Sequence, residues 1–300
     1  MPGILTFGEI LWDVYENESL IGGAGLNFAS HCAKCGAKSY MISAIGDDEL
    51  GRNAIERVKE FGVEPRFIGT ADTPTGQCTV TLNEAKIPTF RLHENSAYDN
   101  ITLSETDLEE IREMKFDALC FGTLIQRGAV SRNTLKTLCA ACAFPNIVCD
   151  VNLRKNCYDA DSVKFCLENA TVLKVSDEEE PELRKLAGYT PKGGSHKDIA
   201  EAVCNKFGQI RYILLTLGEK GSYVYSACKG EGFYCEAEKV TPVSTVGAGD
   251  SYTAAWINAY INGKSPEEAT KKAALLSGYV VSRADAIPPY SFEGDKLITE

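Results

Sequence analysis

The feature that most constrains this fold is an alternation of short apolar runs with helical patterns along nearly the whole chain. Runs rich in Val, Ile and Phe predict buried strands, and the segments between them carry apolar residues at helical spacing. This order is typical of a mainly parallel central sheet built from strand–helix–strand units. The predicted strands are Ile4–Gly8, Ser39–Ala44, Ala118–Phe121, Ile147–Val151, Val172–Val175 and Ile213–Thr216. The predicted helices are Leu26–Lys34, Asp48–Phe61, Ser131–Cys142, Val163–Asn169, Asp198–Asn205, Ala248–Ile261 and Pro266–Ser282.

Two regions break this rhythm. Asp13–Leu20 and Gly76–Leu92 read as short alternating strands, the second with a hairpin turn near Asn83–Lys86. We expect them to form a small sheet that projects from the main domain and closes over a ligand; the alternative is that they are edge strands of the main sheet. No linker or repeat interrupts the chain. We therefore expect a single domain over residues 1–300, with lid segments at about 13–21 and 76–93.

Composition excludes several classes of partner. The net charge is −11 over 300 residues and no Lys/Arg run occurs, which argues against nucleic acid but not against a nucleotide. No apolar stretch approaches the ~20 residues that span a bilayer, and the N-terminus lacks the pattern of a signal peptide. We expect a cytoplasmic protein whose 12 cysteines stay reduced. Cys32/Cys35 and Cys139/Cys142 then serve as small core residues, with a zinc or redox pair as the alternative.

The most informative motif is Ser244-Thr-Val-Gly-Ala-Gly-Asp-Ser251. It follows an extended segment, Tyr234 to Val243, and opens an apolar helical run. Backbone N–H groups at a glycine-rich helix start are free to bind an anion, and the helix dipole favours that binding. Asp250 is out of place in a site that only binds phosphate, but suits one where a base deprotonates an attacking hydroxyl. The alternative is that Asp250 only caps the helix.

Further glycine clusters occur in a fixed order. Gly22-Gly-Ala-Gly-Leu-Asn27 leads into a helix, Gly46-Asp-Asp-Glu-Leu-Gly51 is a turn and helix start, and Thr216-Leu-Gly-Glu-Lys-Gly221 follows a strand. Together with Gly247–Asp250, this order resembles the ribokinase-like (PfkB) carbohydrate kinases, and most closely the bacterial fructokinases. The resemblance extends from Ile4 to about Pro289. It implies a three-layer α/β/α fold with a mainly parallel central sheet and a small β-sheet lid, which in this family often mediates dimerisation.

The resemblance also implies a mechanism. Asp250 would be the general base, and the N–H groups of Gly247, Ala248, Gly249 and Asp250 would form the anion hole for the transferring phosphoryl group. The remaining residues divide by ligand: Asp13, Gly23, Asn27 and Arg154 for the sugar, and Thr216, Gly218 and Gly221 for ATP. The family's Asn-x-x-Glu motif appears as Ser176-Asp-Glu-Glu179, so Glu179 would organise Mg²⁺ through water.

Two departures from the family pattern concern a monovalent cation. Ser244 replaces the usual aspartate at the start of the anion-hole motif, and Asp285-Ala286 replaces the usual Gly-Ala near the C-terminus. Both regions contribute to the potassium site that many members use. The sequence therefore predicts weak or absent dependence on K⁺.

The substrate class follows from shorter matches. Asp150-Val-Asn-Leu-Arg154 resembles an element of fructokinases and 2-keto-3-deoxygluconate kinases, while Gly8–Asp13 and Phe90–Leu92 resemble fructokinases. Fructose ranks first, a keto-deoxy sugar acid second, and other hexoses or pentoses third. A nucleoside kinase is a further alternative, with Phe90 and Tyr98 as walls for a base. The alternative outside enzymology is a sugar or nucleotide sensor, which the Ser176 and Ser244 replacements would suit.

Overall fold

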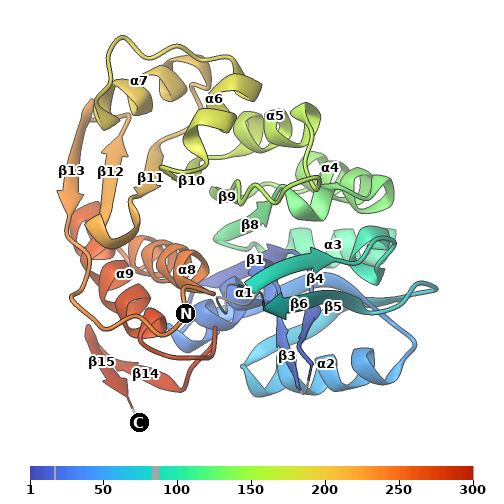
Figure 1. The fold of residues 1–300 in the computed structure, drawn as a ribbon. Helices are drawn as coiled ribbons and strands as arrows, with labels where there is room; N and C mark the ends of the chain where they lie inside the picture. Colours follow the sequence, from blue (N-terminus) through green and yellow to red (C-terminus); the bar gives the residue numbers. More distant parts are fainter. Residues whose placement is uncertain (17, 83–87, 300) are drawn as a thin grey trace.

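A nine-stranded sheet forms the centre of the molecule (Figure 1). The computed structural model describes residues 1–16, 18–82 and 88–299. Seven neighbouring strands of the sheet run parallel. At one edge β12 pairs antiparallel with β11, and β13 pairs antiparallel with β12. The spatial order is β13 (Glu231–Cys235), β12 (Ser222–Ser226), β11 (Tyr212–Thr216), β10 (Val172–Ser176), β9 (Asn146–Asp150), β8 (Ala118–Gly122), β1 (Gly3–Phe7), β4 (Lys38–Gly46) and β5 (Val63–Ala71).

Helices cover both faces of this sheet, which gives the expected three layers. Side chains alternate along a strand, so Ile4 packs into one apolar cluster while Leu5 and Phe7 pack into another. The face that Ile4 meets is covered by α1 (Ala24–Lys34), α2 (Glu49–Glu60), α8 (Ala248–Ile261) and α9 (Pro266–Val281). The opposite face is covered by α3 (Glu105–Met114), α4 (Ala129–Ala141), α5 (Ala160–Asn169), α6 (Glu180–Ala187) and α7 (His196–Lys206).

Local sequence explains where the helices begin. Five side chains cap a helix by accepting a hydrogen bond from a backbone N–H of the first turn: Asp48, Ser104, Asp159, Ser195 and Ser265. Every predicted helix is present, but α3 and α6 were not predicted. Both are polar helices that bury only two residues each, so their apolar periodicity is too weak to detect.

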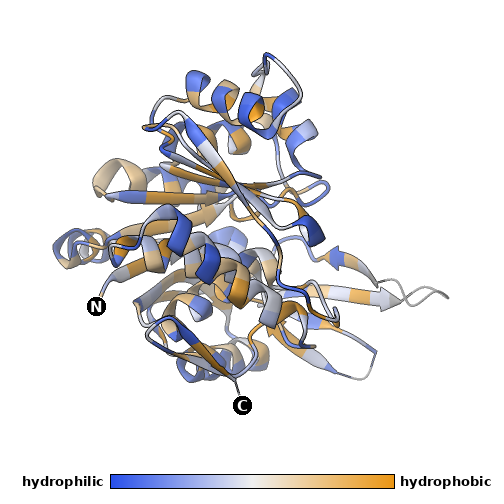
Figure 2. Ribbon diagram, turned by 90° about the vertical axis from the view of Figure 1, so that its left-hand side faces the viewer, coloured by the Kyte–Doolittle hydropathy of each residue, from blue (hydrophilic) through white to orange (hydrophobic). Residues whose placement is uncertain are grey.

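The separate small sheet is also present. It consists of β3 (Ser19–Gly22), β2 (Leu11–Val14), β6 (Gly76–Leu82) and β7 (Pro88–Leu92) in that order. Figure 2 shows it projecting from the body. The prediction of a sheet distinct from the main one is therefore confirmed, while the hairpin turn predicted near Asn83–Lys86 lies outside the described residues. Three 3₁₀ turns, η1 (Ala97–Asn100), η2 (Leu124–Gln126) and η3 (Gly218–Lys220), and a C-terminal hairpin of β14 (Tyr290–Glu293) and β15 (Lys296–Thr299) complete the fold.

The extended segment predicted from Tyr234 to Val243 is wrong beyond Cys235. Strand β13 pairs with β12 only as far as Ser222↔Cys235. Since β12 begins at Ser222, no strand remains for the chain to pair with. Residues 236–247 therefore leave the sheet and cross to the start of α8 without regular secondary structure.

Candidate active site

The candidate site lies where the parallel strands end, beside the start of α8. This edge of an open α/β sheet is where such folds bind ligands. Gly247 precedes α8 with φ of +81°, and a Cβ there would lie 2.8 Å from the carbonyl oxygen of Ala286, so only glycine fits. Within the described residues the N–H groups of Gly249 and Asp250 meet no acceptor, while the Ala248 N–H donates to Thr245 O at 3.3 Å. The helix start therefore offers free donors to an anion.

Asp250 and Asn27 meet at this helix start although 223 positions separate them in sequence. Asn27 Nδ2 donates to Asp250 Oδ2 at 2.8 Å, whereas Asn27 Oδ1 is buried and has no hydrogen-bond partner in the part of the chain that the structure describes. A Cβ on Gly22 would lie 3.4 Å from Asp13 Oδ2 and 3.9 Å from Asn27 Oδ1, so Asp13 faces the same space. Burial raises the pKa of both Asp250 and Asp13, and a hydrogen bond from Asn27 opposes the rise at Asp250.

Glu9 is a carboxylate of this region that sequence reasoning missed. It follows β1, is 5% exposed, and accepts a hydrogen bond from the Gly25 N–H at 3.4 Å. Burial raises its pKa. Gly23, with φ of +107°, would place a Cβ 2.7 Å from the Glu9 carbonyl oxygen, so this glycine is required for packing. A cavity of about 30 Å³ is lined by Glu9, Asp150, Asn152 and Asp250, among others.

Lys174 was also missed. It lies on β10 among apolar neighbours, and its Nζ donates to Asp150 Oδ1 at 3.1 Å. Burial raises the pKa of Asp150 to about 6, against the opposing effect of Lys174. Sequence could have indicated this residue, because a lysine inside a predicted buried strand needs a partner.

Three hydrogen bonds hold the Glu179 carboxylate in place. Oε2 accepts from the Ser176 N–H and hydroxyl at 2.9 and 2.8 Å, and Oε1 accepts from the Leu153 N–H at 2.8 Å. Burial opposes ionisation, but Lys174 and these hydrogen bonds keep the pKa of Glu179 below its usual value. Ser176, which replaces the family asparagine, thus orients Glu179.

The carboxylates of this site suit an Mg²⁺ ion that keeps its water ligands. No group of three or more His, Cys, Asp or Glu side chains in the described chain could hold a metal. Glu179 is ionised, but both of its oxygens already accept hydrogen bonds. Mg²⁺ retains several waters and binds substrate phosphates, so contact with Glu179 through water is compatible with this geometry.

The loop between β11 and β12 holds the residues predicted to bind nucleotide. Thr216 ends β11 and pairs with Ser176 at the end of β10, so the nucleotide and metal motifs are neighbours. Gly218 has φ of +58° and open space around it, whereas a Cβ on Gly221 (φ +96°) would overlap the Cys235 carbonyl oxygen. Gly221 is therefore required by the contact with β13, and Gly218 by its backbone conformation alone.

Arg154 lies two residues after Asn152, which has a φ of +37°. Its guanidinium makes no hydrogen bond or ion pair with any residue that the structure describes. It is nevertheless close enough to lower the pKa of Asp250, Asp13 and Glu9 against the larger effect of burial. The predicted sugar-site residues are thus brought within electrostatic range of one another.

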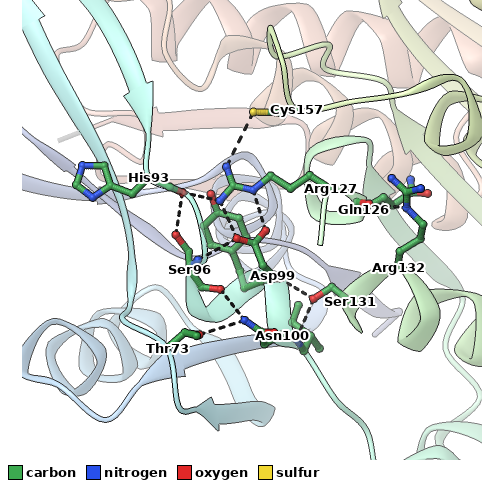
Figure 3. A network of polar contacts seen from close by, with 12 residues as sticks. Thr73, His93, Ser96, Asp99, Asn100, Gln126, Arg127, Ser131, Arg132 and Cys157 are labelled. Atoms are coloured by element: carbon green, nitrogen blue, oxygen red, sulfur yellow. Dashed lines mark hydrogen bonds and ion pairs between the residues drawn. The ribbon is translucent and has the colours of Figure 1, made fainter. Parts of the chain in front are cut away.

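A buried ion pair braces the base of the small sheet (Figure 3). Arg127 donates to both carboxylate oxygens of Asp99 at 2.8 Å each and to the His93 carbonyl oxygen at 2.6 Å. Its guanidinium lies 4.8 Å from the centroid of the Tyr98 ring. His93 follows β7, so the pair ties the small sheet to the body. Sequence reasoning did not identify it.

Tyr98 cannot serve as the wall of a nucleoside site, which corrects that part of the nucleoside alternative. Its side chain is 0% exposed, because it packs beneath Arg127 and against Gly76. Phe90, the other residue named for that role, is 47% exposed on β7.

His31 contacts the C-terminal segment that carries Asp285-Ala286, one of the two departures from the family pattern. His31 Nε2 lies 2.9 Å from the Ala286 carbonyl oxygen and Nδ1 lies 2.7 Å from the Tyr290 hydroxyl. Burial lowers the pKa of His31 to about 4, so the ring is neutral. A neutral imidazole carries one N–H. The Ala286 carbonyl can accept a hydrogen bond but cannot donate one, so Nε2 carries the proton and donates it to Ala286 O. Ser244 Oγ accepts from the Val246 N–H at 3.2 Å.

Comparison with known proteins agrees with this geometry. Residues 4–292 match the pfkB family of carbohydrate kinases. The chain belongs to that family. An uncharacterized sugar kinase of Pyrococcus horikoshii is 30% identical over 254 residues, 82% of this chain and 74% of the relative. Fructokinase-2 of Solanum lycopersicum is 28% identical over 285 residues, 87% of this chain and 83% of the relative.

Solved structures share the architecture of this pfkB carbohydrate kinase. The ATP complex of the Pyrococcus horikoshii sugar kinase superimposes with a TM-score of 0.77 at 26% identity, covering 95% of this chain and 94% of the other. The 2-dehydro-3-deoxygluconokinase of Thermotoga maritima gives a TM-score of 0.79 at 20% identity, covering 95% of each chain. The predicted ribokinase-like fold is therefore confirmed. Among the described residues, no helix is both long and apolar enough to span a membrane.

Proposed function

We propose that this pfkB kinase is a fructokinase that transfers the γ-phosphoryl group of ATP to a hydroxyl of fructose. The observation that carries the proposal is the meeting of Asp13, Asn27 and Asp250 beside the free N–H groups at the start of α8. These side chains present mainly hydrogen-bond acceptors, including Asn27 Oδ1, which no described residue pairs with. A neutral polyol can donate a hydroxyl to each of them.

In the proposed mechanism Asp250 accepts the proton of the attacking hydroxyl. The sugar oxygen forms a bond to the γ-phosphorus, the bond from that phosphorus to the bridging oxygen breaks, and ADP leaves with the electron pair. The N–H groups of Gly247, Ala248, Gly249 and Asp250 stabilise the charge on the phosphoryl oxygens; we expect the Ala248 N–H to leave Thr245 O for this purpose. Mg²⁺, held through water near Glu179, would neutralise phosphate charge.

Nucleotide binding is assigned to the loop that carries Thr216, Gly218 and Gly221. The segment 236–247 passes beside this loop and exposes three valines, Val240, Val243 and Val246. Apolar walls of this kind suit a nucleobase. ATP would then place its phosphates at the helix start and its base against the exposed valines.

The small sheet is assigned the role of a lid. Asp13 lies on β2 of that sheet, so the element that would close also carries a sugar-binding side chain. Closure would exclude water from the phosphoryl group. Leu20 and Phe90 are 38% and 47% exposed on the same sheet; dimerisation through it stays a prediction.

A keto-deoxy sugar acid is the second candidate, favoured by the guanidinium of Arg154, which has no partner among the described residues. A coupled ADP-release assay with Mg·ATP and fructose, 2-keto-3-deoxygluconate, ribose, glucose or adenosine separates the candidates, with Asp250→Asn as control. We expect the highest kcat/KM with fructose and no turnover by Asp250→Asn. Preference for the acid, lost in Arg154→Gln, would move the assignment to the second candidate. No turnover with any acceptor would favour the sensor.

A further inference from the structure

The buried lysine on β10 has no place in the mechanism above. Its side chain is 9% exposed, and it lies between the apolar residues Leu173 and Val175. A Cβ on Gly249 would lie 3.0 Å from Lys174 Nζ, so the ammonium contacts the underside of the anion-hole turn. Burying an ammonium among apolar groups is costly unless negative charge compensates it.

Three carboxylates supply that negative charge. Burial lowers the pKa of Lys174, but Asp150, Glu179 and Asp250 together outweigh burial and raise the pKa above its ordinary value. Among the residues that the structure describes, only Asp150 is within ion-pair distance of Lys174, at 3.1 Å. An ammonium has three N–H groups, and in the described part of the chain no second acceptor for Nζ is found. Asp150 therefore satisfies one of the three N–H groups of Lys174, and the other two have no acceptor among the described residues.

We infer that Lys174 is a positioning residue for phosphoryl transfer: from beneath Gly249 its ammonium fixes Asp150 and offsets the negative charge of Asp250 and of the phosphoryl group above it. Lys174 neither forms a bond nor exchanges a proton in this role. The inference rests on the proposed function of Asp250 as the base, but not on the identity of the sugar.

The physical reason is the charge that ATP brings. Without Lys174, three carboxylates would face one another and the phosphates, and like charges raise the pKa of a carboxyl. Asp250 would then be protonated, and unable to act as a base, over a wider pH range. Two other charged groups also act on this carboxyl: Arg154 from the β9–α5 loop and Glu9 from the end of β1. Arg154 is exposed, so solvent and salt screen it more than they screen Lys174.

The test compares Lys174→Met with Lys174→Arg in the ADP-release assay, using whichever sugar the wild type accepts. We expect Lys174→Met to lower kcat about 10²-fold, the scale found when one stabilising donor is removed from an oxyanion-type site. The KM values for sugar and ATP should change little, the acid limb of the pH profile should move to higher pH, and Lys174→Arg should retain part of the rate. Lys185→Met, at an exposed lysine paired with Glu182, is the control for loss of a lysine elsewhere.

A merely structural role is excluded by the double variant Lys174→Met/Asp150→Asn. Removing both charges avoids an unpaired buried carboxylate, so thermal stability should largely return. Under the inference, kcat should not return, because Asp250 and the phosphoryl group still lack the compensating ammonium, whereas loss of the Asp150 charge should move the acid limb part of the way back. Recovery of both stability and rate, or a wild-type kcat in Lys174→Met, would overturn it.

A readout without turnover separates this inference from the proposed function. The ¹³C carboxyl resonance of Asp250, assigned with Asp250→Asn, should titrate at higher pH in Lys174→Met than in the wild type. An unchanged titration would refute the inference even in an active enzyme. A shifted titration would support it even if the wild type turned over none of the sugars, which would count against the proposed function alone.

Discussion

The buried Arg127–Asp99 pair allows a stability prediction with an internal control. Their side chains are 14% and 10% exposed, and Arg127→Met would remove the two hydrogen bonds to Asp99 and the one to His93 O. It would leave the Asp99 carboxylate buried, with the Ser96 N–H at 2.9 Å as its remaining donor. Losing one partner of a buried ion pair costs about 3–5 kcal/mol, so the free energy of unfolding should fall by that amount.

Arg57 offers the matched control. It also contacts a carboxylate, that of Glu60, and an aromatic ring, that of Phe61 at 4.8 Å. The Arg57 and Glu60 side chains are 47% and 58% exposed, however, and exposed pairs contribute at most about 1 kcal/mol. Arg57→Met should therefore cost far less than Arg127→Met, although the two substitutions are chemically identical.

Urea denaturation of both variants, followed by circular dichroism, measures the difference. Arg127→Met/Asp99→Asn should regain part of the loss, since a neutral amide leaves no unpaired charge and can still accept from the Ser96 N–H. Equal unfolding midpoints for Arg127→Met and Arg57→Met would refute the reasoning, because burial is the main difference between the two sites.

Four further predictions follow from the site. Burial raises the pKa of Asp250, so kcat/KM should fall on acidification at a pH above the ordinary aspartate value of about 3.9; a limb at or below that value would contradict a buried base. Gly221→Ala should lower the unfolding temperature more than Gly218→Ala, since both incur the left-handed penalty of about 1–2 kcal/mol but only the former overlaps the Cys235 carbonyl; equal shifts would disprove the clash. His31 has a folded-state pKa of about 4 and an ordinary value of about 6.5, so the unfolded chain binds more protons between these pH values, and stability should drop by about 3 kcal/mol as pH falls from 6.5 to 4. Comparing wild type with His31→Gln isolates this contribution, and parallel pH dependences would argue against it. Finally, replacing Na⁺ with K⁺ should change the rate little, because the Ala286 carbonyl already accepts from His31; a large activation would show that a cation site exists.

Much of the fold was predictable because its signals are local. The apolar runs of β1, β8 and β10 and the start of α8 at Ala248 follow from neighbouring residues alone. The polar helices α3 and α6 escaped detection because each buries only two side chains. The end of β13 at Cys235 depends on where its partner β12 begins, which the segment itself does not encode.

The candidate site divides in the same way. The chemistry of its own motif indicated Asp250, while the roles of Asn27 and Glu179 came from the resemblance to the pfkB family. Sequence reasoning missed Glu9 and Lys174, whose significance comes from what surrounds them. Tyr98 was misjudged because an aromatic residue in the polar segment 93–100 gives no sign of being covered by an arginine from another element.

Neighbouring residues are enough to specify the strand–helix alternation and the glycine-rich helix start with Asp250, because backbone conformation and periodicity depend on residues a few positions apart. Which charges meet, in contrast, depends on the tertiary fold. Lys174 contacts the turn at Gly249, and His31 reaches Ala286 across 255 positions. Such pairings depend on strand order and helix packing, and burial then determines how strongly each charge acts.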